Sequence, residues 1–335
     1  MSSVAAACTS LRLGFLGVGW IGRHRMEAIA GSGTARIAAI ADPARHLAAQ
    51  AGQLAPDAVI AESLEELLDQ ELDGVVIATP SALHAEQSVA ALERGMAVFC
   101  QKPLARTAGE TARVVDAARA ADRLLGVDLS YRFINGAGSM REMVRSGGLG
   151  RIYAANLVFH NAYGPDKAWF YDPALSGGGC VIDLGIHLVD LALWVLDFPR
   201  VESVSSHLFS EGEPLVHREG KVEDYAMAQI AIEGGSALQL ACSWKLPAGC
   251  DAVIQASFYG TGGGVSLRNV GGSFYDFTVE RYRGTARETI SSPPDEWGGR
   301  AVVEWARRLA DGQKFDPQAG RLVDVASVLD SIYQR

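Results

Sequence analysis

The sequence contains little cysteine and no cysteine pattern. Its five cysteines are scattered along the chain and form no Cys-x-x-Cys pair. Disulfide frameworks and zinc sites need paired or clustered cysteines, so neither is indicated, and we expect no bound metal. No apolar run reaches the length that spans a membrane, and the first eight residues lack the basic start of a secretion signal. We therefore expect a cytoplasmic protein with no membrane partner.

Positive charge is also scarce. Lys and Arg number 30 against 39 Asp and Glu, which gives a net charge of −9. A chain of this sign is repelled by a phosphate backbone, so we expect no nucleic-acid partner. Hydrophobic residues make up 48% and charged residues 21%, a composition that excludes intrinsic disorder. A length of 335 residues suits roughly two domains.

Glycine, in contrast, is abundant. The chain has 37 glycines, where average usage predicts roughly 23. They show no every-third-residue repeat, which excludes a collagen-like chain. The excess must serve turns or close approaches of the backbone.

The first 130 residues alternate strand-length apolar runs with helical stretches. Near-continuous apolar strands between helices predict a parallel sheet covered on both faces. After residue 131 the runs are separated by glycine clusters, which predicts an antiparallel arrangement closed by two final helices. We therefore expect an α/β protein with a Rossmann-type domain over 1–130 and a substrate-binding and oligomerisation domain over 131–335. The expected strands of the first domain are 11–17, 37–41, 74–78, 97–100 and 124–127.

A Gly-x-Gly-x-x-Gly motif lies between the first expected strand and the first expected helix. In that context the first glycine permits a tight turn, the second lets the backbone approach a pyrophosphate, and the third lets the helix pack closely. The N–H groups at the helix start then face the anion. The alternative is a tight turn that binds no ligand. The residues expected at the cofactor are Gly17, Gly19, Trp20, Ile21 and Gly22.

Asp42 ends the second expected strand, 20 residues after Gly22. An acid at this place accepts the hydroxyls of the adenosine ribose and repels a 2′-phosphate. We therefore expect NAD rather than NADP, although Arg45 lies close enough to soften the preference. The alternative role for Asp42 is a helix cap.

Two further strand ends carry polar residues. Ligands bind at the carboxyl edge of a parallel sheet, so these residues are candidates for the site. Thr79-Pro80 follows one strand, with His84 shortly after; these residues either contact the cofactor or form a turn and a packed histidine. Gln101-Lys102 follows the next strand, and both residues are also expected to contact the cofactor. A partly desolvated lysine there can orient and polarise a substrate oxygen, or it can be a solvated loop lysine.

Three glycines at 177–179 precede Asp183 and His187. Because residues four apart share a helix face, the acid and the histidine project together. Such a pair can shuttle a proton, with the acid or Asp190 supporting the ring. The alternative is a helix-start acid beside a hydrogen-bonded core histidine.

Together, the glycine turn, Asp42, Thr79-Pro80, Lys102-Pro103 and the segment 177–187 resemble the Gfo/Idh/MocA family of NAD(P)-dependent oxidoreductases. The resemblance covers most of the chain. It implies a Rossmann domain followed by an α/β domain with a large, open, mostly antiparallel sheet. It also implies a catalytic set of Lys102, Asp183 and His187. The family commonly has Glu-Lys-Pro where this chain has Gln101-Lys102-Pro103, so the carboxylate beside the lysine is missing.

The resulting hypothesis is an NAD-dependent dehydrogenase that acts on a sugar, cyclitol or related polyol. Two alternatives stay open: an NAD(P)-binding regulator without turnover, and a glycosidase that oxidises its sugar transiently. We also expect a homodimer or homotetramer, because the free face of the open sheet should be too apolar for water. Besides the catalytic set, the residues expected to contact the substrate are Tyr131, Arg132, Asn135, Asn161, Tyr163, Trp169 and Asp172.

Overall fold

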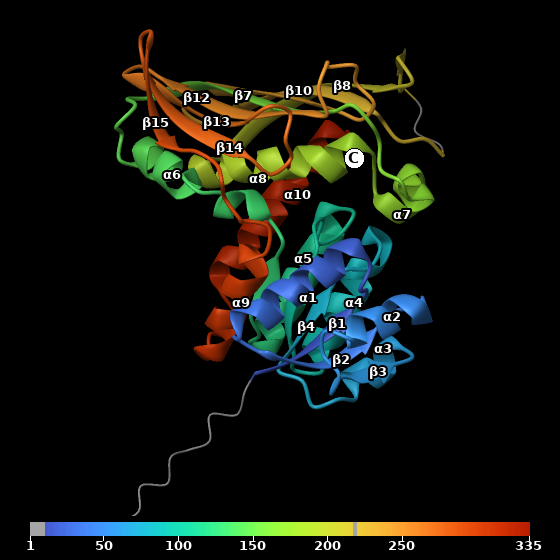
Figure 1. Cartoon of the computed structure of the whole chain (residues 1–335). Coiled ribbons are helices and arrows are strands. Elements are labelled where there is room, and N and C mark those ends of the chain that lie inside the picture. The colour runs from blue at the N-terminus through green and yellow to red at the C-terminus, as the bar shows by residue number, and fades with distance from the viewer. Residues whose placement is uncertain (1–10, 217–219) are drawn as a thin grey trace, which may run out of the picture.

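Two β-sheets organise the part of the chain that the structure describes, residues 11–216 and 220–335. This computed structural model contains a six-stranded sheet in the N-terminal part and a nine-stranded sheet in the C-terminal part (Figure 1). The expected fold class, a Rossmann-type parallel sheet joined to a large and mostly antiparallel sheet, is confirmed.

The six-stranded sheet is parallel throughout, with the order β3-β2-β1-β4-β5-β6. This is the doubly wound order in which a ligand crevice opens where the strand order reverses, between β1 and β4. The strands are β1 (Arg12–Leu16), β2 (Arg36–Ala41), β3 (Val59–Ala61), β4 (Gly74–Ile77), β5 (Ala97–Cys100) and β6 (Leu125–Val127). The helices are α1 (Trp20–Ser32), α2 (Arg45–Gly52), α3 (Leu64–Leu68), α4 (Ser81–Glu93) and α5 (Ala108–Ala121).

Both faces of this sheet are covered, which explains why its strands are apolar at almost every position. Leu13 and Phe15 of β1 pack with α1 and α2 on one face, whereas Val75 and Ile77 of β4 pack with α3, α4 and α5 on the other. The sequence analysis did not predict β3 or α3. β3 is a three-residue edge strand whose first two side chains are exposed, so it lacks the apolar signal of a buried strand.

The nine-stranded sheet has the order β15-β14-β13-β12-β7-β11-β10-β8-β9. All neighbours run antiparallel except β7 and β11, which are parallel, so the sheet is not a simple meander. Its strands are β7 (Ile152–Asn161), β8 (Val201–Ser210), β9 (Glu213–Pro214), β10 (Tyr225–Ile232), β11 (Ser236–Ser243), β12 (Ala252–Gly260), β13 (Gly263–Asn269), β14 (Phe277–Arg283) and β15 (Ala286–Ser291). The helices are α6 (Ala137–Arg145), α7 (Pro173–Ser176), α8 (Ile186–Val195), α9 (Arg300–Ala310) and α10 (Arg321–Ile332), with short turns η1 (Ser130–Phe133), η2 (Ala168–Tyr171), η3 (Val181–Gly185) and η4 (Pro317–Gly320).

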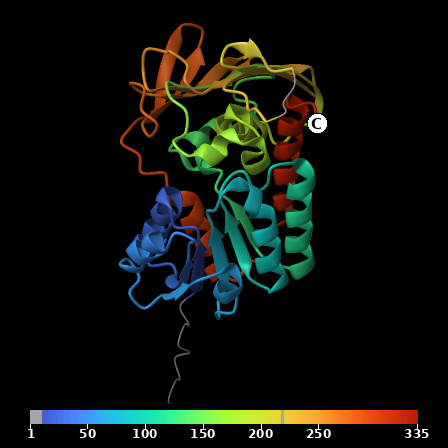
Figure 2. The ribbon, with the colours of Figure 1, turned by 90° about the vertical axis from the view of Figure 1, so that its right-hand side faces the viewer.

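The two faces of the large sheet differ in polarity. The inner face packs on α6 and α8, while in Figure 2 no helix of the described chain covers the outer face. A row of paired, exposed polar side chains crosses four strands of that outer face: Asn156, Gln239, Gln229 and Ser205. Self-association was expected because the free face of the sheet should be apolar. Along this row the free face is polar instead.

The apolar stretch Pro173–Val195 is the central helical segment beneath this sheet. Within the described residues it is the one segment long and apolar enough to cross a membrane, with a mean hydropathy of 1.6, but 83% of it is buried inside the protein. Leu188, Leu191 and Val195 are fully enclosed in the core. Its composition is thus explained by packing against the sheet.

Helix α9 returns to the N-terminal sheet after β15. Trp305 lies beside Phe99 with a ring-centroid separation of 5.7 Å, and it is 3% exposed. A Cβ on Gly74 or Gly126 would lie 2.9 or 2.7 Å from the Trp305 ring, so both strand glycines make room for it. The last helices therefore complete the Rossmann-type core, although they follow the second sheet in the chain.

Removing the Trp305 ring tests this dependence. We expect Trp305→Ala to lower the free energy of unfolding by about 3–5 kcal/mol, because it leaves a cavity between α9 and the sheet. Urea denaturation measures the change. Asp311→Ala, at the exposed end of the same helix, should change stability by less than about 0.5 kcal/mol. A loss below about 1 kcal/mol for Trp305→Ala would show that α9 is only loosely attached.

Candidate active site

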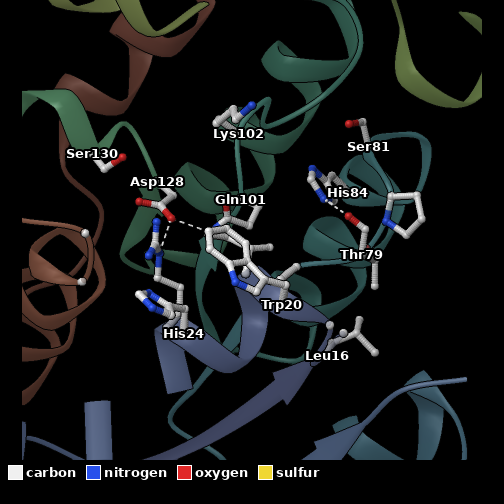
Figure 3. Close-up of a pocket in the computed structure, with 18 of the residues that line it drawn as sticks. Leu16, Trp20, His24, Thr79, Ser81, His84, Gln101, Lys102, Asp128 and Ser130 are labelled. Atoms are coloured by element: carbon white, nitrogen blue, oxygen red, sulfur yellow. Dashed lines mark hydrogen bonds and ion pairs between the residues drawn. The ribbon is translucent and has the colours of Figure 1, made fainter. Parts of the chain in front are cut away.

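A cavity of about 1740 Å³ lies at the carboxyl edge of the parallel sheet and extends to the second domain. Its wall includes the segments that follow β1, β4, β5 and β6, and parts of η3, α8 and α9. Figure 3 shows side chains that follow β4, β5 and β6, together with Trp20 and His24 of α1. Ligand sites in doubly wound folds occupy this edge, so this cavity is the candidate site.

The glycine turn has the geometry that the motif predicts. Gly17 has φ 82°, and a Cβ there would lie 2.7 Å from the Ala78 backbone. A Cβ on Gly22 would lie 2.1 Å from the Gly17 oxygen, so this glycine allows the close packing of helix and turn. Gly19 is the N-cap of α1; a Cβ there would meet only the Lys167 ammonium, and no side chain caps the helix. The first-turn N–H groups of α1 are therefore available to an anion such as a pyrophosphate.

Asp42 lies in the cavity wall where β2 ends. Its Oδ2 accepts a hydrogen bond from the Val18 N–H and its Oδ1 accepts one from the Ala44 N–H, both at 2.8 Å. A carboxylate has about four acceptor positions, so two remain for a ribose diol. Arg45 pairs with Glu62 at 2.8 Å instead of facing the cavity. The adenosine end of the cavity thus fits NAD.

His84 connects the two strand-end loops predicted at the site. Its Nδ1 lies 2.7 Å from the Pro103 oxygen and its Nε2 lies 2.7 Å from the Thr79 oxygen (Figure 3). Burial lowers the pKa of His84, and the Lys102 charge lowers it further against the two carbonyl contacts. The Thr79 hydroxyl donates to Gln87. His84 is therefore a packed histidine that positions Thr79-Pro80 and Lys102-Pro103 relative to each other.

Lys102 of the first domain forms an ion pair with Asp183 of the second domain. Its Nζ lies 2.6 Å from Asp183 Oδ1 and 2.7 Å from the Asp183 backbone oxygen. The Trp244 indole donates to Asp183 Oδ2 at 3.1 Å. Lys102 thus has a carboxylate partner in Asp183, although position 101 holds no acid. In the described residues Asp183 makes no hydrogen bond to His187.

A π-helical turn positions His187. Residues Val181–Gly185 form this turn directly before α8, and π-turns occur frequently at functional sites. The His187 ring stacks on Tyr131 at a centroid distance of 4.7 Å, and its buried Nδ1 has no hydrogen-bond partner in the described structure. Burial lowers the pKa of His187 well below its usual range, and the charges of Lys102 and Arg25 add to this. The imidazole is therefore neutral at neutral pH and can accept a proton.

The triple glycine makes room for the protein's own backbone and side chains. A Cβ on Gly179 would lie 1.9 Å from the Glu223 oxygen, and one on Gly178 would lie 2.1 Å from the Tyr333 hydroxyl. The Glu223 carboxylate accepts from the Gly179 and Val181 N–H groups and from the Tyr333 hydroxyl. Burial raises the pKa of Glu223. This buried cluster fixes the start of the π-turn and so the direction of Asp183.

A second buried charge cluster lies beside Lys102. Asp128 follows β6 and is 1% exposed; its Oδ2 accepts from Arg25 Nε at 2.5 Å and from the Gln101 amide (Figure 3). Its Oδ1 is buried without a partner in the described structure. The Gln101 amide can donate to a carboxylate, whereas a Glu at 101 would place two carboxylates in contact. Gln101, which stands where the family commonly has Glu, is therefore compatible with the acid at Asp128.

The structure brings together most, but not all, of the residues expected at the site. Tyr131 and Trp169 line the cavity with the catalytic set. Arg132 pairs with buried Asp190, which removes Asp190 as a support for His187. Asp172 caps α7, Asn135 binds Asp295 and Ser291 through its backbone, and neither lines the cavity. Asn161 and exposed Tyr163 also lie outside its wall.

Several residues of the cavity wall were not among those predicted from the sequence. Asp128 and Ser130 follow a strand end, the same signal that identified Thr79 and Lys102, so they were within reach of that argument. The others come from helix α1 or from segments distant in sequence, and no local pattern identifies them. Among them are Arg25, Lys167, Phe274, Trp297 and Arg300.

Comparison with known proteins agrees with this fold. Residues 11–129 match the family model "Oxidoreductase family, NAD-binding Rossmann fold", and residues 138–266 match the "GFO/IDH/MocA C-terminal domain". An NAD-binding Rossmann domain is thus joined to a GFO/IDH/MocA C-terminal domain. The chain belongs to the GFO/IDH/MocA oxidoreductase family.

Individual relatives are more distant. D-glucoside 3-dehydrogenase of Escherichia coli is 33% identical over 60% of this chain and 60% of its own length. Inositol 2-dehydrogenase of Rhodococcus erythropolis is 27% identical over 93% of this chain and 83% of its own length. The structure of levoglucosan dehydrogenase with NADH has a TM-score of 0.83 at 22% identity, covering 97% of this chain and 96% of that one. The chain therefore spans less than two thirds of the glucoside dehydrogenase that it matches.

Exchanging the charge between residues 101 and 128 tests the buried cluster. Asp128→Asn leaves the Arg25 guanidinium without a carboxylate, and we expect it to lower the free energy of unfolding by about 3–5 kcal/mol. Gln101→Glu alone should also destabilise, because it faces Asp128. The double variant Gln101→Glu/Asp128→Asn restores one carboxylate beside Arg25 and should recover at least half of the loss. Thermal and urea unfolding measure these changes, and purely additive effects would contradict a shared charge site.

Proposed function

We propose that the protein is an NAD-dependent oxidoreductase that transfers a hydride between a hydroxyl carbon of a sugar, cyclitol or related polyol and nicotinamide. One observation carries the proposal: Lys102, Asp183 and a neutral His187 line the same cavity as the glycine turn of α1. The names of the relatives, which include glucoside and inositol dehydrogenases, support the substrate class.

NAD, when bound, supplies the hydride acceptor of this reaction. The chain's own residues then handle the oxygen and its proton. Neutral His187 accepts the hydroxyl proton as the carbonyl forms, since its pKa is held low by burial. The Lys102 ammonium donates to the reacting oxygen and stabilises the developing negative charge. Asp183 positions this ammonium and, with the Trp244 indole on its other oxygen, keeps a fixed orientation.

The expected compartment is the cytoplasm, and the expected assembly is a homodimer or homotetramer. The polar row on the outer face of the large sheet means that an interface there would be joined by side-chain hydrogen bonds as well as apolar contact.

A substrate panel with NAD⁺ tests the function directly. Sugars, inositols and their glycosides are offered, and reduced cofactor is followed by its absorbance. With a substrate found, we expect Lys102→Met and His187→Asn each to lower kcat/KM by about 10²–10⁴-fold. His160→Asn, a half-buried histidine outside the cavity wall, serves as the matched control. Wild-type turnover by both site variants would refute the role assignment.

The pH dependence follows from the same side chain. Because the pKa of His187 lies below 6.5, the base form persists as pH falls through that value, and the acid limb of kcat/KM should lie below pH 6.5. His187→Asn should remove this limb. An acid limb above pH 7 would contradict the assignment.

Cleavage of a nitrophenyl glycoside without net cofactor reduction would favour the glycosidase alternative, and tight NAD binding without any turnover would favour the regulator.

Asp42 determines the expected choice of cofactor. Asp42→Asn keeps a hydrogen-bonding side chain but removes the charge that repels a 2′-phosphate. We expect the affinity for NADP⁺ relative to NAD⁺ to rise roughly tenfold, about 1.4 kcal/mol. Fluorescence titration with each nucleotide measures the ratio. An unchanged ratio would mean that Asp42 acts only through the Val18 and Ala44 backbone.

A further inference from the structure

Lys167 belongs to the second domain but lies at the glycine turn of the first. It precedes η2 in the segment after β7, and α7 beyond it packs against α4 of the Rossmann-type domain. Figure 1 shows α7 projecting from the C-terminal domain toward the N-terminal helices. Lys167 lines the cavity together with Gly17 and Gly19. A side chain from one domain thus reaches the phosphate-binding turn of the other.

The Lys167 ammonium lies close to the N-cap of α1. The Lys167 Nζ lies 3.6 Å from the point that a Cβ of Gly19 would occupy, and no other described atom beyond the adjoining residues lies within 4 Å of that point. Gly19 is the N-cap of α1. The Lys167 ammonium therefore stands directly over the first turn of this helix.

This arrangement places like charges together. The start of α1 carries partial positive charge and free N–H groups, it has no side-chain cap, and it has no acidic residue in its first turn. Helix α5, in contrast, has Thr107 as a side-chain cap and Glu110 in its first turn. Within residues 11–216 and 220–335, no hydrogen bond or ion pair engages the Lys167 ammonium. An anion held between the helix start and the ammonium would balance both.

We infer that Lys167 binds the pyrophosphate of the dinucleotide from the opposite side to the α1 N–H groups, and so links the two domains through the cofactor. A lysine ammonium is a suitable point charge for a phosphate oxygen. The inference rests on NAD binding at the glycine turn. It assigns to Lys167 a cofactor-binding role that the motif alone does not contain.

The link has a structural consequence for the segment that carries Lys167. The same segment continues into Trp169 and Phe170, which line the cavity near the candidate substrate site. Lys167 is exposed, and its ammonium lies beside the N-cap of α1. Binding of a pyrophosphate would therefore hold residues 162–172 over the cofactor.

Calorimetric titration of the full chain with NAD⁺, ADP-ribose and adenosine tests the inference. For Lys167→Met we expect the affinities for NAD⁺ and ADP-ribose to fall about 10–100-fold, the loss of one charge-assisted hydrogen bond. Adenosine, which has no phosphate, should bind as before. Lys167→Arg should recover much of the affinity. The salt dependence of ADP-ribose binding should become shallower in Lys167→Met, because one charge contact is gone.

Lys245 provides the matched control. Its ammonium lies 5.1 Å from the centre of the Tyr171 ring, close to the same segment but outside the cavity wall. Lys245→Met should leave all three affinities within about twofold of wild type. Hydrogen exchange gives a second readout: ADP-ribose should protect residues 162–172 in the wild type but not in Lys167→Met.

The possible results distinguish the role of Lys167 from the proposed function of the protein. ADP-ribose affinity unchanged in Lys167→Met, or an equal loss for adenosine, would overturn the role of Lys167 while leaving the proposed function intact. Failure of the folded wild type to bind either NAD⁺ or ADP-ribose would overturn both. Unchanged thermal unfolding of Lys167→Met without nucleotide establishes that the variant is folded.

Discussion

The ion pair between Lys102 and Asp183 is the interaction on which the site depends. It joins the end of β5 to the π-turn before α8, two elements of different domains separated by 81 residues. Each partner is held by its own surroundings: Lys102 by the loop that His84 connects to Thr79, and Asp183 by Trp244 and by the glycine-rich turn seated on Glu223. The reacting oxygen of a substrate would therefore meet an ammonium whose position both domains determine.

Around this pair, two further buried acids of the described residues have an arginine partner. Arg25 and Asp128 form a second buried pair, and Asp190 takes Arg132. Among the described residues, six buried side-chain polar atoms lack a hydrogen-bond partner, and two of them, His187 Nδ1 and Asp128 Oδ1, belong to residues of the cavity wall. Removal of either partner of such a buried ion pair would leave an uncompensated buried charge, which is strongly destabilising.

The sequence predicted features that depend on local geometry. The glycine turn, the lysine at a strand end and the shared helix face of Asp183 and His187 follow from backbone conformation, strand polarity and helical period. The partners could not be predicted in the same way. Asp183 meets Lys102 instead of His187, and Arg132 meets Asp190 instead of a substrate, because the packing of distant segments decides these contacts. Lys167 lies in an irregular segment with no periodic signal, so its approach to Gly19 could be found only in three dimensions.

The return of α9 to the N-terminal sheet affects how the protein can be made. During synthesis, β1 to β6 leave the ribosome long before Val302 and Trp305 do, so one face of the first sheet stays partly uncovered while about half of the chain is still to come. The nascent domain must then tolerate exposed Phe99 and its neighbours, a state prone to association. The core of the N-terminal sheet is thus closed by a helix that is synthesised only after all strands of the second sheet.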